Sequence, residues 1–225
     1  MLASYLPRGS QAMLFIPSLK GLWTRAMLRG VHYRDSFQRI DMLYMIPDPW
    51  NLDNPQERFR YQETNRLIRN EFGHVTRLLE VGCGEGYQSQ YLAQVCSQLH
   101  GCDVSTRAVE RARKRCPNST FSVGTLGDIL VHQAELYDLV VACEVLYYID
   151  DVLDAIQTMS RLGTSCLVTY YQSHQDRLDR IITPLELGDR AIIRNGDSTW
   201  IAVWWRSDRL RRVQQDRTDS QSQSS

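Results

Sequence analysis

Short apolar runs alternate with helix-like patterns through the middle of the chain. The apolar runs have the length of buried strands and are residues 77–81, 99–104, 119–123, 137–143 and 165–171. The stretches in which apolar positions have helical spacing are residues 87–98, 107–115 and 152–161. This alternation predicts an open, largely parallel sheet that is covered by helices on both faces.

A different pattern follows near the carboxyl end. Two apolar runs flank the dipeptide Asn195-Gly196, which is typical of the turn in a β-hairpin. Strand alternation predicts that Trp200 and Trp204 share one face of this hairpin and that Trp205 lies on the other. The two predicted strands are residues 191–194 and 199–205.

The chain before residue 73 has a different pattern of apolar, basic and proline residues. Apolar and basic side chains mix up to about residue 46, prolines then interrupt the chain, and a second helical pattern follows. A helix near residues 17–28 would pack over the main domain or, alternatively, contact a membrane surface or a partner. Trp50 and Tyr61 are the candidates for a lid. We interpret three segments, which are a helical cap with the lid at 1–72, the main domain at 73–206 and a disordered polar tail at 207–225.

Composition limits the classes of function. The 225 residues include 26 Lys and Arg against 26 Asp and Glu, so the chain has no overall attraction for nucleic acid or an anionic membrane. The six cysteines include no CxxC pair and predict buried, reduced thiols rather than disulfides or a zinc site. The longest apolar run of the first segment, residues 13–16, is too short for a signal peptide or a transmembrane helix. We therefore expect a cytoplasmic protein.

A glycine-rich loop follows the first predicted strand of the main domain. Gly82, Gly84 and Gly86 alternate with other residues, and a backbone without Cβ atoms lets a ligand lie against it. The spacing is GxGxG, whereas the dinucleotide fingerprint is GxGxxG. Glu80, at the end of the strand, would repel a pyrophosphate but suits a ligand that carries an ammonium group. A nicotinamide-dependent oxidoreductase is disfavoured for these two reasons.

The second predicted strand ends in an acid. Asp103 lies at the carboxyl edge of the sheet, where open α/β sheets bind ligands, and a carboxylate there can accept both hydroxyls of a ribose. Val104 follows and can press on one face of a purine. The glycine loop and the acid together predict a nucleoside site.

These residues resemble the class I S-adenosylmethionine-dependent methyltransferases, in which an acid precedes GxGxG and the second strand ends in a ribose-binding acid. The resemblance covers about residues 44–206 and implies a doubly wound, Rossmann-like, seven-stranded sheet with an antiparallel last strand. It implies S-adenosylmethionine as the cofactor, with Glu80 near its ammonium group, Asp103 on its ribose and Val104 on its adenine. The residues that it assigns to the cofactor are Tyr61, Glu80, Gly82, Cys83, Gly84, Asp103, Val104, Thr125, Leu126 and Cys143.

One position departs from that family. Its third strand usually ends in an acid that contacts the adenine amine, whereas this chain has Thr125 at the closest match and Asp128 three residues later. The adenine contact therefore stays open.

The fourth predicted strand resembles the fourth motif of the family and puts Glu144 beneath the expected methyl-transfer centre. The run Glu-Val-Leu-Tyr-Tyr at 144–148 looks like the branch of the nodulation-factor, NodS-like N-methyltransferases, which methylate an amino group of a glucosamine oligosaccharide. The same branch is suggested by residues 48–50 and by Glu57, Arg58 and Tyr61.

We assign Glu144 and Tyr148 as the catalytic candidates. Glu144 would orient an amine acceptor or accept its proton, and Tyr147 or Tyr148 would line the acceptor pocket. Alternatively, Glu144 only braces the cofactor loop and the tyrosines belong to the core. For His174 and Asp176, which follow the fifth predicted strand, a solvated helix start is favoured over contact with the acceptor. We expect structural roles for His74, His100 and His132 and no metal.

The sequence therefore predicts a methyltransferase that acts on a small-molecule acceptor, with an amine favoured and an amino sugar as one form of it. The alternatives are an O-methyltransferase of another small metabolite and a cofactor-binding protein without turnover. A nucleic-acid methyltransferase is disfavoured because no Asn-Pro-Pro-Tyr-type tetrapeptide follows the fourth strand.

Overall fold

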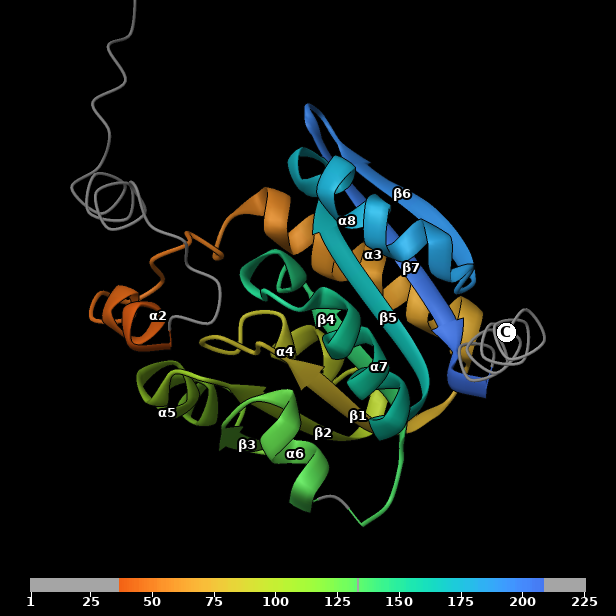
Figure 1. The fold of residues 1–225 in the computed structure, drawn as a ribbon. Helices are drawn as coiled ribbons and strands as arrows, with labels where there is room; N and C mark the ends of the chain where they lie inside the picture. The colour runs from red at the N-terminus through yellow and green to blue at the C-terminus, as the bar shows by residue number, and fades with distance from the viewer. Residues whose placement is uncertain (1–36, 133, 209–225) are drawn as a thin grey trace, which may run out of the picture.

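The computed structural model describes residues 37–132 and 134–208, and the strands in these residues form one seven-stranded sheet. The strand order is β3-β2-β1-β4-β5-β7-β6 (Figure 1). Strands from β3 to β5 run parallel, whereas β7 is antiparallel to both β5 and β6. The strands are β1 (Val75–Val81), β2 (Cys96–Asp103), β3 (Thr120–Val123), β4 (Tyr137–Cys143), β5 (Gly163–Tyr171), β6 (Asp189–Asn195) and β7 (Ser198–Arg206). The predicted doubly wound α/β sheet with an antiparallel last strand is confirmed.

Helices cover both faces of the sheet (Figure 1). The helices α6, α7 and α8 pack on one face, α3 and α4 pack on the other, and α5 packs beside β2 and β3. The helices are α2 (Phe37–Leu43), α3 (Pro55–Phe72), α4 (Ser89–Leu92), α5 (Thr106–Arg115), α6 (Leu126–His132), α7 (Val152–Leu162) and α8 (Gln175–Ile182). Short 3₁₀ helices are η1 (Leu146–Tyr148), η2 (Gln172–His174) and η3 (Thr183–Leu185).

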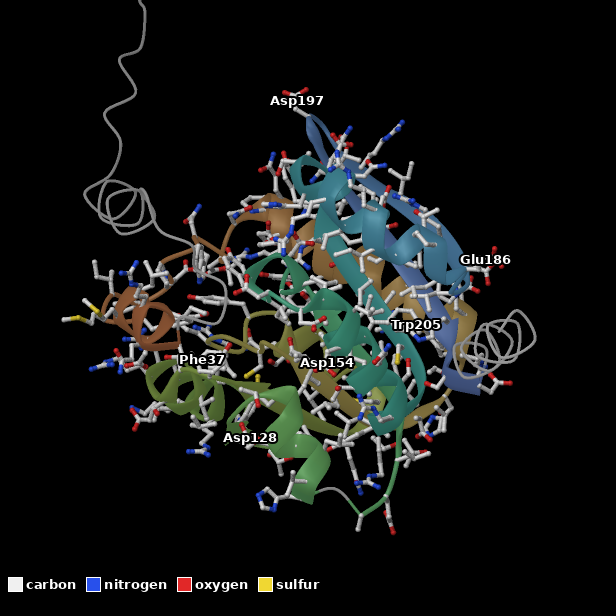
Figure 2. The ribbon with its side chains drawn as sticks, viewed as in Figure 1. Phe37, Asp128, Asp154, Glu186, Asp197 and Trp205 are labelled. Carbon is white, nitrogen blue, oxygen red and sulfur yellow. The ribbon has the colours of Figure 1, made fainter. Side chains whose placement is uncertain are left out.

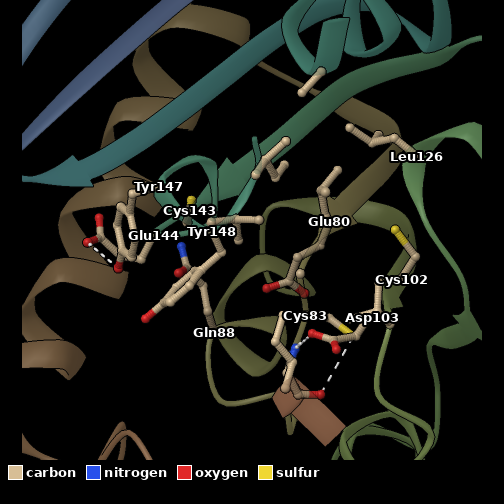
Figure 3. A pocket seen from close by; sticks show the side chains of 18 of the residues that line it. Glu80, Cys83, Gln88, Cys102, Asp103, Leu126, Cys143, Glu144, Tyr147 and Tyr148 are labelled. Atoms are coloured by element: carbon tan, nitrogen blue, oxygen red, sulfur yellow. Dashed lines mark hydrogen bonds between the residues drawn. The ribbon is translucent and has the colours of Figure 1, made fainter. Parts of the chain in front are cut away.

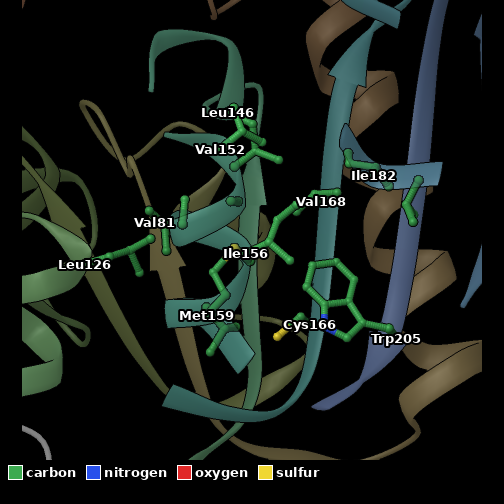
Figure 4. Packing of buried hydrophobic residues seen from close by; sticks show 14 of the residues in the cluster. Val81, Leu126, Leu146, Val152, Ile156, Met159, Cys166, Val168, Ile182 and Trp205 are labelled. Carbon is green, nitrogen blue, oxygen red and sulfur yellow. The ribbon is translucent and has the colours of Figure 1, made fainter. Parts of the chain in front are cut away.

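The central strands contribute side chains to two cores because both of their faces are covered. In β4, Val140 and Ala142 pack on the α7 side, whereas Leu139 and Val141 pack on the α3 side. Figure 4 shows the first of these cores, in which Ile156 of α7 lies against the sheet. The uninterrupted apolar character of β4 thus follows from its central position.

The tryptophans of β7 divide between the two cores as the alternation predicts. Trp200 and Trp204 pack on the α3 side, and Trp205 packs on the α7 side. The indole Nε1 of Trp205 donates a hydrogen bond to Ser160 Oγ at 2.9 Å, so its polar group is satisfied inside the core. The sequence-based interpretation of these residues as core is confirmed.

The hairpin turn is displaced by one residue from its prediction. Asn195 pairs with Ser198, so the two-residue loop is Gly196-Asp197. Gly196 has a φ of +57°, a conformation that glycine adopts without a steric penalty. Asp197 lies at the tip of the hairpin, which projects beyond the rest of the sheet (Figure 2).

The segment after the glycine loop also differs from its prediction. Residues 87–98 have helical spacing of apolar positions, but only Ser89–Leu92 are α-helical and β2 begins at Cys96. The reason is that β1 begins at Val75, before the apolar run, and Val75 pairs with Cys96. Strand pairing satisfies the backbone of these residues and overrides their local periodicity.

Two helices precede the sheet. The α3 helix begins after Asn54, whose side chain accepts hydrogen bonds from two backbone amides of the first turn, and its Ile68 packs on the sheet. The α2 helix contacts α5 through Asp41, which accepts a hydrogen bond from Ser105 Oγ at 2.6 Å and forms an ion pair with Arg107. The helix predicted near residues 17–28 lies outside the described residues.

The packed part of the chain extends at least to Ser207. Ser207, the first residue assigned to the tail, is buried, and its hydroxyl donates a hydrogen bond to the carbonyl oxygen of Gly163 at 2.6 Å. Residues 209–225 lie outside the described part of the chain. The sequence did not predict this contact, because serine is polar and its hydrogen-bond partner is a backbone group far away in the sequence.

The α7 helix offers a matched test of the core. Ile156 is 0% exposed and Leu153 is 40% exposed on the same helix. We expect Ile156→Ala to lower the free energy of unfolding by about 2–5 kcal/mol, because it leaves a cavity among close-packed side chains. Leu153→Ala should change it by less than about 0.5 kcal/mol. Urea denaturation measures both, and equal losses would contradict this packing.

Candidate active site

A cavity of about 650 Å³ opens at the carboxyl ends of the central strands (Figure 3). Its volume lies in the range of small-molecule sites, and it lies where the strand order reverses between β1 and β4. The residues assigned to the site from sequence all line it, and they are Tyr61, Glu80, Gly82, Cys83, Gly84, Asp103, Val104, Thr125, Leu126, Cys143, Glu144 and Tyr148.

The three glycines of the loop after β1 are needed for different structural reasons. Gly82 has a φ of +67°, and a Cβ at this position would lie 2.4 Å from Val145 Cγ2 in the loop after β4. A Cβ on Gly86 would lie 3.0 Å from the Cα of Ala112 in α5. Gly84 has a φ of +51°, and its nearest neighbour would be the Tyr44 hydroxyl at 3.0 Å. Gly82 and Gly86 are therefore required by contacts within the protein, and Gly84 is the glycine best placed to face a ligand.

Asp103 is fixed by the backbone of two loops. Its Oδ2 accepts a hydrogen bond from the amide of Gly84 at 2.9 Å (Figure 3). Its Oδ1 accepts one from the amide of Ser105, also at 2.9 Å. Burial raises the pKa of this carboxyl, whereas the two amide hydrogen bonds oppose the rise. Each oxygen keeps a further lone pair, so Asp103 can accept two more hydrogen bonds from a ligand in the cavity.

Glu80 is a buried acid beside the glycine loop. Its Oε2 accepts a hydrogen bond from Ser89 Oγ at 2.5 Å. Burial raises the pKa of Glu80 to about 8, although Ser89 and the Arg60 charge both lower it. Glu80 is therefore mainly protonated at neutral pH, and a cation brought next to it would favour the ionised form.

A buried guanidinium faces the acids across the cavity. Arg60 of α3 donates a hydrogen bond to Gln88 Oε1 at 2.8 Å and forms an ion pair with Glu57 at 2.7 Å. Gln88 is 7% exposed, and its Nε2 has no hydrogen-bond partner in residues 37–132 and 134–208. A buried donor without an acceptor is costly. Arg60 and Gln88 thus present donors that suit a carboxylate.

Sequence reasoning missed Arg60 and named the nearby Arg58 only as a residue that suggests the NodS-like branch. Arg58 is exposed and pairs with Asp53, because it lies on the outer side of α3. The available signal was the helical period, since Arg60, Tyr61, Thr64, Asn65 and Ile68 share the buried side of α3. Polar residues at the spacing of an apolar face indicate a buried polar site.

Glu144 follows β4 with a strained backbone. Its φ is +60°, a left-handed conformation that is uncommon for a residue with a side chain. Its Oε1 accepts a hydrogen bond from Thr169 Oγ1 at 3.1 Å, and its Oε2 accepts one from the Tyr147 hydroxyl at 3.3 Å. Burial raises the pKa of Glu144, whereas the Arg60 charge lowers it. The carboxylate is thus held in one orientation at the edge of the cavity.

Four rings form an aromatic wall on this side of the cavity, made of Trp50, Tyr148, Tyr147 and His174. The ring centroids of Trp50 and Tyr148 are 5.4 Å apart, and those of Tyr148 and Tyr147 are 4.6 Å apart. The rings of Tyr147 and His174 are stacked, with centroids 4.0 Å apart and an interplanar angle of 14°. Both tyrosines reach the cavity because they lie in the 3₁₀ helix η1, where strand alternation does not apply.

The structure corrects the interpretation of the residues after β5. His174 was assigned to a solvated helix start, but it is half-buried and lines the cavity, because η2 turns the chain back over η1. Asp176, in the first turn of α8, is exposed and does not line the cavity. His100 is held by Tyr137 and Ser122, in agreement with a structural role.

The structure gives Thr125 and Asp128 different surroundings. Asp128 accepts hydrogen bonds from the amide and the hydroxyl of Thr125, at 2.8 and 2.7 Å, and does not line the cavity. Its carboxylate stabilises the start of α6 instead. Thr125 and Leu126 do line the cavity, as do Phe37 and Ile40 of α2.

The described residues offer neither a metal site nor a membrane-spanning helix. In the described ranges, no group of three or more His, Cys, Asp or Glu side chains could hold a metal ion. No helix in residues 37–132 or 134–208 has the length and apolar character needed to cross a membrane. All six cysteines are free thiols; four are buried as predicted, whereas Cys96 and Cys143 are only partly buried.

Known proteins with similar sequences carry one family description. The family pattern described as Nodulation protein S (NodS) matches residues 36–178. Nodulation protein S of Rhizobium tropici is 33% identical over 135 residues, which are 59% of this chain and 56% of that protein. Nodulation protein S of Sinorhizobium fredii (strain NBRC 101917 / NGR234) is 40% identical over 113 residues, which are 49% of this chain and 51% of that protein. The matched part of the chain thus spans about half the length of these curated relatives.

A solved structure agrees with these sequence matches. The crystal structure of N-methyltransferase NodS from Bradyrhizobium japonicum WM9 in complex with S-adenosyl-L-homocysteine is similar, with a TM-score of 0.63 and 27% sequence identity. The similarity covers 78% of this chain and 98% of that chain. With a family pattern matched over more than half of its residues, the chain belongs to the NodS family.

Proposed function

We propose that this protein is an S-adenosylmethionine-dependent methyltransferase that acts on an amino group of a small molecule. The observation that carries the proposal is the carboxylate of Asp103, which is fixed by two amides at the mouth of a glycine loop with its free lone pairs available to the cavity. The related NodS N-methyltransferase, crystallised with S-adenosyl-L-homocysteine, supports the same cofactor and reaction.

The residues present fit this cofactor. The buried Gln88 Nε2 lacks an acceptor next to Arg60, and a methionyl carboxylate would supply one. Glu80 would hold the ammonium group, and Asp103 would accept the two ribose hydroxyls. Val104 and Leu126 would contact the adenine, because both are apolar, line the cavity and closely follow the ends of β2 and β3.

The cofactor, once bound, supplies a methyl group on a positively charged sulfur. The residues of the chain position the acceptor and keep water away from it. Glu144 is held by Thr169 and Tyr147 and would bind the acceptor nitrogen through its carboxylate. The aromatic wall excludes water and offers ring faces that attract a cation.

An amine acceptor is favoured over a hydroxyl by the same contacts. A buried carboxylate next to aromatic faces stabilises a positive nitrogen, whereas an alcohol gains little from it. An amino sugar fits this chemistry, since its amine would meet Glu144 while its ring lies on the aromatic wall. The free thiols favour a reducing compartment, and we assign the enzyme to the cytoplasm on that basis.

Removal of the Asp103 carboxylate tests the cofactor site. We expect Asp103→Ala to weaken S-adenosylmethionine binding at least about 100-fold, because it deletes two hydrogen bonds to a charged acceptor. Asp197→Ala, at the exposed tip of the hairpin, is the matched control and should bind normally, since Asp197 does not line the cavity. Isothermal calorimetry gives both affinities and thermal melting checks the fold. Equal affinity of the two variants would refute the assignment of Asp103.

Protonation of Glu80 gives a second test. A cofactor ammonium next to Glu80 would lower its raised pKa, so binding at a pH below about 8 should release a proton from it. Affinity should then rise with pH up to about 8. Calorimetry at pH 7 in two buffers with different heats of ionisation counts the protons released. Glu80→Gln should release fewer protons than the wild type, and an unchanged number would place the ammonium group elsewhere.

Glu144 should matter for turnover more than for cofactor affinity. We expect Glu144→Gln to lower kcat by about 10-fold to 100-fold while the dissociation constant of the cofactor changes less than threefold, because its carboxylate orients the acceptor. Glu186→Gln is a matched control, since Glu186 also has a positive φ, of 48°, but does not line the cavity. Steady-state kinetics and calorimetry separate the two effects. A parallel loss of turnover and cofactor affinity would make Glu144 a brace for the cofactor loop.

A further inference from the structure

His174 ends the aromatic wall and has a ring that other residues leave available. It lies in η2, directly after β5, and lines the same cavity as Glu144. Its ring stacks on Tyr147, which holds it in one plane. None of the hydrogen bonds formed within residues 37–132 and 134–208 involves either of its ring nitrogens. A ring fixed by stacking, with free nitrogens, is suited to exchange a proton with a bound molecule.

The surroundings of the ring favour its neutral form. Burial and the positive charge of Arg177 on α8 both lower the pKa of His174. Asp176, on the same helix, is exposed, and Tyr147 of η1 presents its ring face. The part of β7 that packs against η2 is uncharged there, with Trp200 opposite Tyr171. The imidazole is therefore neutral at neutral pH and has a lone pair.

Glu144 is less suited to the same task. Both of its oxygens already accept hydrogen bonds from hydroxyl groups, which stabilise its ionised form, although burial raises its pKa overall. A carboxylate held in this way binds and orients an ammonium group well but takes its proton poorly. An amine with a pKa above the working pH reaches the cavity as an ammonium ion, which has no lone pair for the attack. The site therefore needs a second group that removes one proton.

We propose that His174 takes this proton while Glu144 orients the acceptor nitrogen, an inference that rests on the proposed methyl transfer. The N–H bond of the ammonium ion breaks, the proton goes to an imidazole nitrogen, and the electron pair stays on the acceptor. That pair forms the new N–C bond to the methyl group as the electron pair of the S–C bond returns to sulfur. His174 then releases its proton to solvent through the exposed part of its ring, and the methylated product leaves as a cation.

Two substitutions separate proton transfer from packing. His174→Phe keeps a ring that can stack on Tyr147 but has no nitrogen, and His174→Gln keeps polar atoms without a base. We expect both to lower kcat about 100-fold at pH 7, in line with the usual contribution of a general base. The loss should shrink to within a few-fold at a pH above the pKa of the acceptor amine, where the amine is already neutral. His132→Phe, at an exposed position that does not line the cavity, is the control and should keep wild-type kcat at every pH.

The measurement is the transfer of labelled methyl from S-adenosylmethionine to glucosamine oligosaccharides with free amines, from pH 6 to pH 10. Thermal melting and S-adenosyl-L-homocysteine affinity confirm that the variants are folded. A His174→Phe variant with normal kcat at pH 7, or a loss of equal size at every pH, would overturn the role of His174. No transfer by the wild type, to this acceptor or to a panel of other small amines, would instead overturn the proposed function.

Discussion

The buried carboxylate of Asp103 is the contact on which the arrangement of the cavity depends. It accepts amide hydrogen bonds from Gly84 in the loop after β1 and from Ser105 at the start of α5. Ser105 in turn accepts a hydrogen bond from the Ala108 amide and donates one to Asp41 of α2. One acid at the end of β2 thus ties together the glycine loop, α5 and α2.

The cavity buries charged and polar side chains whose hydrogen-bonding and charge partners are incomplete. Glu80, Asp103 and Glu144 are acids whose pKa values are raised because water is excluded, and Arg60 is the cation among them. Gln88 adds a donor without an acceptor. Such a set is costly on its own but is complementary to a ligand with two positive groups and one carboxylate. The sheet tolerates this cost because both of its faces bury large apolar cores.

Several parts of this structure were predictable because their cause is local in the sequence. The apolar runs of β4 and β5, the GxGxG spacing and the acid at the end of β2 each follow from the residues themselves. Arg60 was missed because it is only two residues from Arg58, which lies on the exposed side of the same helix. The short α4 and the placement of His174 depend on strand pairing and on the path of η2, which are tertiary effects. Local patterns do not contain that information.

We expect the cavity to hold S-adenosylmethionine with its ribose on Asp103 and its methionyl group between Glu80, Arg60 and Gln88. A crystal structure of the protein with S-adenosyl-L-homocysteine tests it most directly. We expect both ribose hydroxyls of the ligand within hydrogen-bond distance of Asp103. The carboxylate of the ligand should lie next to Arg60 and Gln88, and its sulfur should face Glu144 and the aromatic wall. A ligand bound with its ribose away from Asp103, or an empty cavity at saturating ligand, would contradict it.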